Sequence, residues 1–279
     1  MIRLATVFSG VGAPEQALLL EGFDYQVVFA CDNGERKLPY DYETVIERFK
    51  QSRQTDLNQF VKELYLSTKK ENFVKQAYLA NYKISENCWF DDIRFIDGKK
   101  YKNEIDLFIG GSPCQSFSNM GKRKGLDDTR GTLFYDFARL VKEMQPKVFI
   151  YENVPGMLTH DKGNTWKIIN QTFNNLGYKT VFKVINALDY GIPQNRKRIF
   201  VVGFKFKNKE LDESIFLSDF FLNSKSETAA ADMKISKSGI NFKIASFISL
   251  LVSTRTTLKT DGISTLTLAT TNFKSAPLI

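Results

Sequence analysis

The feature that most constrains the fold is a series of short apolar runs that each end at glycine or polar residues. RLATVFSG opens the series, and a glycine turn, a helical pattern closed by Gly22 and a second run, YQVVFACD, follow it. The later runs are IDLFIGG, KVFIYEN, TVFKVINA and RIFVVGF, with the helical patterns GTLFYDFARLVKEM and GNTWKIINQTFNNLGY between the first three of them. Strands that alternate with helices predict an α/β fold, with a doubly wound parallel sheet and helices on both faces.

Two regions depart from this alternation. Residues 35–88 carry helical periodicity and many charges, and we predict a helical insertion there with a solvated outer face. After about residue 206 the pattern weakens, and the Thr-rich run LLVSTRTTLKTDGISTLTLATTNF suits short antiparallel strands. We therefore predict a main domain over residues 1–206 and a small β-rich appendage over residues 207–279.

Composition limits the class of protein. The three cysteines, Cys31, Cys88 and Cys114, are odd in number and far apart, so we expect no disulfide framework, no metal site and a reducing cytoplasm. No apolar run is long enough to span a bilayer, and the first residues already have a strand pattern, which argues against a signal peptide. The net charge of +8 favours a polyanionic partner such as nucleic acid, although a lysine-rich proteome would give the same charge.

A glycine turn follows the first predicted strand, in FSGVG at residues 8–12, and Asp32 ends the second. Glycines at a strand-to-helix turn let a ligand approach the backbone, and an acid at the second strand end can accept hydrogen bonds from ribose hydroxyls. The pattern G-x-G-x-x-G is absent, because Pro14 and Glu15 follow Ala13. A cofactor with a ribose and no pyrophosphate, such as S-adenosylmethionine, fits better than NAD, while a simple turn acid is the alternative for Asp32.

Three further features sit at predicted strand ends. Cys114 lies on a glycine-rich turn, where a thiolate could act as a nucleophile, although a lone cysteine is more often inert. Glu152 ends KVFIYEN, which should lie beside IDLFIGG or one strand away, so this acid should be close to Cys114 and could donate a proton to a bound ring. Arg196 and Arg198 should face the same way at a strand start and suit a phosphate or a carboxylate.

Together these motifs resemble the DNA cytosine carbon-5 methyltransferase family. The stretches that match the family's motifs occur in the family's order over roughly residues 3–205, apart from the helical insertion: FSGVGA, ACDNG, FDDIR, GGSPCQSFS, DDTRGTLFYDFAR, ENVPGML and ALDYGIPQNRKRIFVVG. The resemblance implies a Rossmann-like, S-adenosylmethionine-dependent methyltransferase fold. It also implies methyl transfer to carbon 5 of a flipped-out cytosine in a specific double-stranded DNA sequence, through a covalent cysteine adduct.

The resemblance also implies roles for single residues. Cys114 would attack carbon 6 of cytosine, Glu152 would hold and protonate ring nitrogen 3, and Asn153 would brace the cysteine loop. Arg198 would contact the flipped base, with Arg196 supporting the loop and phosphates. The implied cofactor contacts are Phe8, Gly10, Val11, Gly12, Asp32, Asn33, Asp92, Ile93, Pro113 and Leu133. The implied DNA contacts are Gln115, Ser118, Lys122, Arg123, Lys124 and Arg130.

The family's ninth and tenth motifs are not found in this chain, which ends with DGISTLTLATTNFKSAPLI. We therefore interpret residues 207–279 as a partial target-recognition region of a truncated enzyme, or of a split enzyme whose partner chain supplies the rest. One alternative is a catalytically silent module that binds DNA or cofactor. A tRNA cytosine methyltransferase is a weaker alternative, because the Cys-Phe-Thr signature of that branch is not seen. The preferred setting is a bacterial restriction-modification system, with a cognate restriction endonuclease as genetic partner.

Overall fold

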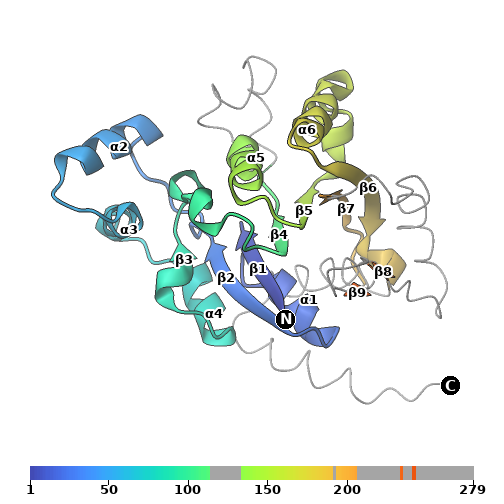
Figure 1. Ribbon diagram of the computed structural model, residues 1–279, viewed down its shortest axis with the longest axis horizontal. Helices are drawn as coiled ribbons and strands as arrows, with labels where there is room; N and C mark the ends of the chain where they lie inside the picture. Colours follow the sequence, from blue (N-terminus) through green and yellow to red (C-terminus); the bar gives the residue numbers. More distant parts are fainter. Residues whose placement is uncertain (114–132, 191–192, 206–232, 235–240, 243–279) are drawn as a thin grey trace.

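The computed structural model describes residues 1–113, 133–190, 193–205, 233–234 and 241–242. Its centre is a seven-stranded sheet with the strand order β3-β2-β1-β4-β5-β7-β6 (Figure 1). The strands are β1 (Ile2–Val7), β2 (Tyr25–Cys31), β3 (Trp89–Phe90), β4 (Leu107–Gly110), β5 (Val148–Asn153), β6 (Lys179–Asn186) and β7 (Lys197–Phe204). The six apolar runs predicted as strands of the sheet are strands, and the two-residue β3 is an addition to them.

The direction of β7 corrects the prediction of a parallel sheet. The strands β3, β2, β1, β4 and β5 are parallel to one another, whereas β7 runs antiparallel to both β5 and β6. A parallel connection needs a crossover of about a dozen residues or more, usually a helix. Among the described residues, only the single 3₁₀ turn η8 (Ala187–Tyr190) lies between β6 and β7. The chain therefore returns beside β6 in the opposite direction.

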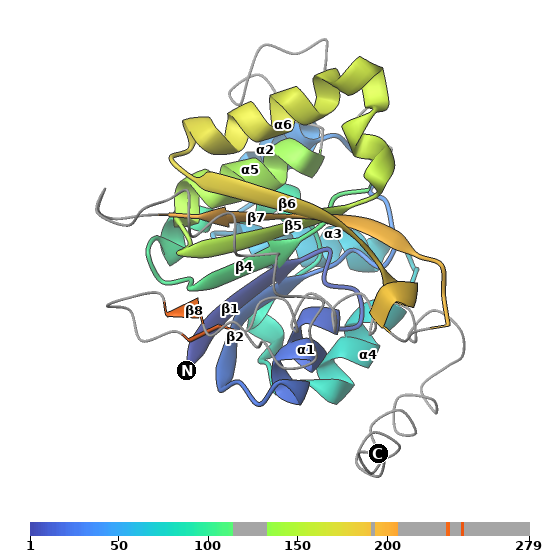
Figure 2. The same ribbon diagram turned by 90° about the vertical axis from the view of Figure 1, so that its right-hand side faces the viewer.

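Helices cover both faces of the sheet, as predicted. In Figures 1 and 2, α5 (Leu133–Met144) and α6 (Asn164–Asn175) lie on one face, and α1 (Ala13–Leu20) and α4 (Phe73–Asn81) lie on the other. Aromatic rings fill the first interface, where the ring centroids of Phe108 and Phe137 are 4.7 Å apart. Leu18 of α1 packs with Leu4 and Ile109 on the opposite face. Such burial of apolar surface is the main force that holds the layers together.

The region predicted as a helical insertion contains α2 (Tyr42–Gln51), α3 (Leu57–Ser67) and α4. Each begins at a polar residue, Asp41, Asp56 or Asn72, whose side chain accepts a hydrogen bond from a backbone N–H of the first turn. These helices are not only solvated surface, because Tyr65 and Tyr78 are 1% and 0% exposed. The segment therefore packs against the rest of the domain through its aromatic residues.

Short elements complete the described chain. The 3₁₀ turns are η1 (Glu86–Cys88), η2 (Ile93–Phe95), η3 (Gly98–Tyr101), η6 (Pro155–Leu158), η7 (His160–Gly163) and η8. In the predicted appendage, β8 (Met233–Lys234) pairs antiparallel with β9 (Asn241–Phe242), and the Thr-rich run lies outside the described residues. None of the helices in the described ranges has the length and apolar character needed to cross a membrane.

Candidate functional site

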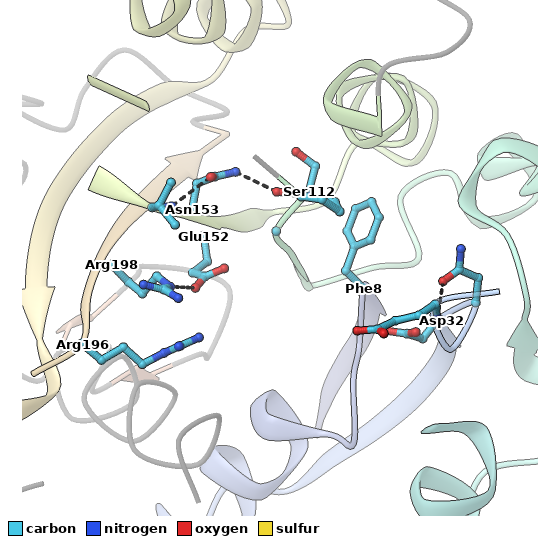
Figure 3. A pocket seen from close by; sticks show the side chains of 12 residues that line it. Phe8, Asp32, Ser112, Glu152, Asn153, Arg196 and Arg198 are labelled. Atoms are coloured by element: carbon cyan, nitrogen blue, oxygen red, sulfur yellow. Dashed lines mark hydrogen bonds and ion pairs between the residues drawn. The ribbon is translucent and has the colours of Figure 1, made fainter. Parts of the chain in front are cut away.

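A pocket of about 300 Å³ lies at the carboxyl ends of the parallel strands, where open α/β sheets bind their ligands. Its wall combines residues that the sequence assigned to two different tasks. The predicted cofactor contacts in the wall are Phe8, Asp32, Asn33 and Pro113, and the predicted catalytic residues are Glu152, Asn153, Arg196 and Arg198. In Figure 3, Phe8 lies between Asp32 on one side and Glu152 with Arg198 on the other. The fold thus brings residues from distant parts of the chain into one cavity.

Asp32 fixes one end of the pocket. It follows β2 directly, and its carboxylate accepts hydrogen bonds from the backbone N–H groups of Gly10 and Gly34, at 2.9 and 2.8 Å. Gly10 belongs to the turn after β1 and has a φ angle of 55°, in the left-handed region that glycine adopts readily. Asp32 therefore joins the turn after β1 to the turn after β2.

Glu152 and Arg198 occupy the other end of the pocket. Their side chains form an ion pair with an Nε–Oε1 distance of 3.1 Å, and they are 12% and 21% exposed. Glu152 also packs on Gly111, where a Cβ atom would lie 2.6 Å from its Oε2 atom. Arg196 precedes β7 and lines the same pocket as Arg198.

Asn153 holds the turn after β4. Its Nδ2 atom donates to the carbonyl oxygen of Ser112 at 2.9 Å and to the hydroxyl of Tyr151 at 3.1 Å. The hydroxyl groups of Tyr151 and Ser112 are 2.6 Å apart. Burial raises the pKa of Tyr151, so its hydroxyl stays protonated. This network fixes the backbone that leads into Pro113.

Several predicted site residues lie outside the described part of the chain. These are Cys114, Gln115, Ser118, Lys122, Arg123, Lys124 and Arg130, which follow Pro113 in sequence. Their roles stay predictions. Because β4 and β5 are adjacent and parallel, the turn that leads to Cys114 starts beside Glu152, as the sequence indicated.

Other predicted cofactor residues do not line this pocket. The carboxylate of Asp92 accepts a hydrogen bond from the Tyr65 hydroxyl at 2.8 Å and lies 2.6 Å from a guanidinium nitrogen of Arg94. Ile93 is buried in the core at 3% exposure, and Leu133 is half-buried against the same core. Gly10, Val11 and Gly12 form the turn after β1, next to the pocket wall rather than in it.

The structure adds residues that the sequence did not single out. Glu35, Gly111, Ser112 and Val154 also line the pocket. The charge of Glu35, so close to Asp32, was a usable signal. Ser112 and Val154 line the pocket because they lie in the turns after β4 and β5. The residue types alone do not mark them as pocket residues.

Comparison with known proteins identifies the family of this chain. A family model described as C-5 cytosine-specific DNA methylase matches residues 54–275. The chain is 33% identical over 236 residues to orphan methyltransferase M.SPRI of Bacillus phage SPR, and this match covers 84% of this chain and 45% of that protein. It is 52% identical over 100 residues to Type II methyltransferase M.HhaI of Haemophilus parahaemolyticus, and this match covers 36% of this chain and 31% of that protein.

A solved structure shares the fold. The crystal structure of S. pombe Dnmt2 methyltransferase has a TM-score of 0.51 and 18% sequence identity, and the match covers 85% of this chain and 59% of that one. This chain spans less than half the length of the two curated relatives named above. The family match nonetheless extends over most of the chain, and the resemblance seen in the motifs is thereby confirmed. The chain belongs to the C-5 cytosine-specific DNA methylase family.

Proposed function

We propose that this chain transfers a methyl group from S-adenosylmethionine to carbon 5 of a cytosine in duplex DNA. The observation that carries the proposal is the shared pocket, which has Asp32 at one end and the Glu152–Arg198 ion pair at the other. A cofactor held near Asp32 and a base held near Glu152 would meet across Phe8. Membership of the C-5 cytosine-specific DNA methylase family supports this reading.

The residues present fit the proposed cofactor. Asp32 stands at the end of β2, where a carboxylate can accept hydrogen bonds from ribose hydroxyls. Phe8 offers an apolar ring, and Asn33 and Pro113 complete this part of the wall. A volume of about 300 Å³ lies at the lower end of the range for small-molecule sites. These residues would hold S-adenosylmethionine, and its product S-adenosylhomocysteine, without a metal ion.

In the proposed mechanism the Cys114 thiolate forms a bond to carbon 6 of the cytosine ring. Glu152 holds a proton at ring nitrogen 3 and so offsets the negative charge that this attack creates. Carbon 5 would then be nucleophilic enough to take a methyl group; S-adenosylmethionine, when bound, would supply that group by cleavage of its sulfur–methyl bond, with S-adenosylhomocysteine as the leaving group. A base removes the proton from carbon 5, and the Cys114 thiolate leaves as the carbon 5–carbon 6 double bond re-forms.

The proposed substrate has to leave the double helix, because the faces of a stacked ring are covered by its neighbours. Arg198 would contact the flipped base, and Arg196 would support the loop and nearby phosphates. Lys122, Arg123 and Lys124, with Gln115, Ser118 and Arg130, would bind the DNA backbone and the site around the flipped base. The chain's net charge of +8 is consistent with a polyanionic substrate.

The setting of the reaction belongs to the same proposal. The proposed enzyme is cytoplasmic and has a cognate restriction endonuclease as genetic partner, and the Type II name of relatives such as M.HhaI supports the second of these points. The orphan name of M.SPRI supports the other case, a methyltransferase that acts by itself. A second chain that supplies further parts of the enzyme remains an alternative, as does a silent module that binds DNA or cofactor.

Product analysis tests the proposal. Purified chain is incubated with S-adenosylmethionine and mixed-sequence duplex DNA, and the digested nucleosides are examined by mass spectrometry. We expect 5-methylcytosine from the wild-type chain and none from Cys114→Ser. A parallel reaction with tRNA in place of DNA tests the alternative that the chain is a tRNA cytosine methyltransferase. A methylated product other than 5-methylcytosine, or product from Cys114→Ser, would contradict the proposal.

A further inference from the structure

We infer that the helical segment of residues 42–82, here called the insert, positions the three backbone turns of the cofactor site. Four of its side chains contact these turns, or residues next to them, without lining the pocket: Tyr65, Asn72, Tyr78 and Tyr82. Each makes a hydrogen bond to a turn, or to a residue next to one, that the family resemblance assigns to the cofactor. This inference rests on the proposed function and adds a task for a region that the sequence marked only as helical surface.

Tyr82 holds the turn after β1. It follows α4, is 9% exposed, and donates its hydroxyl proton to the carbonyl oxygen of Gly12 at 2.8 Å. Its ring lies directly against Gly12, where a Cβ atom would clash with it. Gly12 also has a φ angle of 91°, which other residues rarely adopt. The glycine thus serves a close approach between the turn and the insert.

Asn72 holds the turn after β2. It is 7% exposed at the start of α4, and its Nδ2 atom donates to the carbonyl oxygen of Asp32 at 2.9 Å and to Asp91 at 3.3 Å. A Cβ atom at Gly34 would clash with the Asn72 side chain. Gly34 is the residue whose N–H binds the Asp32 carboxylate. Asn72 therefore fixes the backbone on which the proposed ribose ligand stands.

Tyr65 and Tyr78 complete the set of contacts. The Tyr65 hydroxyl donates to Asp92 at 2.8 Å, in the third predicted cofactor motif. The Tyr78 hydroxyl donates to Glu15 at 2.7 Å, in the first turn of α1, just after the glycine turn. Burial and the neighbouring carboxylates raise the pKa of both tyrosines, so both hydroxyls remain protonated donors.

The contacts point to positioning rather than to packing alone. Apolar packing needs no hydroxyl or amide groups, yet the insert buries polar atoms whose partners lie in the predicted cofactor turns. A buried polar group is costly unless it is bonded, so each pair holds its two partners in one arrangement. None of these four side chains lines the pocket, which means that they act through the turns and do not touch the cofactor.

Two variants test the inference, each with a matched control. Tyr82→Phe removes one buried hydroxyl, and Tyr178→Phe removes another that donates to the carbonyl oxygen of Pro146 at 2.7 Å, away from the pocket. Asn72→Ala removes a helix-capping side chain, and Asp41→Ala removes the corresponding cap of α2, a helix that carries none of the four contacts. For wild type and each variant, calorimetry gives the dissociation constant of S-adenosylhomocysteine, and thermal melting without ligand gives the stability.

We expect Tyr82→Phe and Asn72→Ala to weaken S-adenosylhomocysteine binding by about 3- to 10-fold each, the range that one hydrogen bond contributes. The two controls should have lower melting temperatures than wild type. Their dissociation constants for S-adenosylhomocysteine should stay within about twofold of wild type, because they lose no hydrogen bond at the site. In steady-state assays the two test variants should raise the KM for S-adenosylmethionine and leave kcat unchanged. A purely structural role would lower stability without this division between KM and kcat.

The results separate the inference from the proposed function. The inference would be overturned if the test variants bound S-adenosylhomocysteine as tightly as wild type, or if the controls lost as much binding as the test variants. In both cases, binding by the wild-type chain would still uphold the cofactor assignment. A wild-type chain that binds no S-adenosylhomocysteine would contradict the proposed function, and the inference with it.

Discussion

The guanidinium group of Arg198 lies 3.1 Å from the carboxylate of Glu152, across the antiparallel pair of β7 and β5. Arg198 is near the start of β7, and Glu152 is near the end of β5. Antiparallel pairing places these two ends at the same edge of the sheet, next to the pocket. A parallel strand would carry its first residues to the opposite edge. The reversal of β7 therefore creates this part of the site.

Replacement of the Glu152 carboxylate should affect chemistry more than cofactor binding. We expect Glu152→Gln to lower kcat by roughly 100- to 10,000-fold, the usual contribution of proton transfer by a positioned side chain. Binding of S-adenosylhomocysteine should stay close to wild type, because Asp32 lies at the other end of the pocket (Figure 3). Methyl incorporation at saturating cofactor and calorimetry measure the two quantities.

The control for this variant weakens ion pairs elsewhere. Asp106→Asn weakens two ion pairs, that of Asp106 with Lys147 at 2.7 Å and that with Arg3 at 3.1 Å, just before the starts of β4 and β5. It should leave kcat unchanged. Near-native turnover by Glu152→Gln would rule out the proposed proton-holding role.

Gly111 sets the place of Glu152. A Cβ atom at Gly111 would lie 2.5 Å from the Glu152 carbonyl oxygen and 2.6 Å from its Oε2 atom. Gly111→Ala should therefore displace the carboxylate and lower kcat by up to roughly 100-fold, since small misplacements of reacting groups are costly. Gly156→Ala is the matched control, because a Cβ atom there meets no atom within 4 Å. Equal activity of the two variants would contradict this account.

Asn153 should matter through the backbone it holds. Asn153→Ala removes the hydrogen bond to the Ser112 carbonyl and leaves that buried oxygen without this donor. We expect a loss of kcat of about 5- to 100-fold, equivalent to the 1–3 kcal/mol cost of an unsatisfied buried group. Asn170→Ala, which removes the acceptor of the Thr180 hydroxyl on the outer part of the domain, is the control. Loss of activity in both variants would indicate general destabilisation.

Asp136 should make stability depend on pH. Burial raises the pKa of this carboxyl group from 3.8 to about 6, and its Oδ2 atom has no hydrogen-bond partner within the described structure. Because the folded state favours the protonated form, the stability from this group is complete below about pH 4 and is lost as pH rises through about 6. The difference corresponds to at most about 3 kcal/mol.

Chemical denaturation from pH 4 to pH 8 measures this effect. Asp136→Asn should be more stable than wild type at pH 8, and the advantage should shrink toward pH 4. Arg139 keeps its bonds to Glu143 and to the carbonyl oxygens of Ile93 and Ile96 in the variant. Asp24→Asn, at a carboxylate that is 80% exposed, controls for the loss of one negative charge. A stability difference independent of pH would contradict the buried-acid account.

Local patterns predicted the elements well, because apolar runs and glycine turns are properties of short stretches. The runs that became β1, β2, β4 and β5 were recognised, and so was the meeting of Glu152 with the turn after β4. That meeting follows from adjacency of parallel strands, which the sequence order of the motifs suggested.

Features set by tertiary contacts could not be predicted. The direction of β7 depends on a connection without a crossover helix, and RIFVVGF reads alike in either direction. The insert was assigned a solvated face, since its helical period reveals amphipathicity but not what Tyr78 or Tyr82 touches. Asp92 was assigned by resemblance, and its partners Tyr65 and Arg94 became visible only in the fold.

The most direct test of the central claim uses duplex DNA that contains 5-fluorocytosine, together with S-adenosylmethionine labelled in the methyl group. Fluorine at carbon 5 cannot leave as a proton does, so the covalent adduct should accumulate. We predict a labelled protein–DNA complex that survives denaturation, with the bond mapped to Cys114, and no complex with Cys114→Ser. A chain that binds cofactor and DNA yet forms no adduct, or an adduct that persists in Cys114→Ser, would contradict the proposed chemistry.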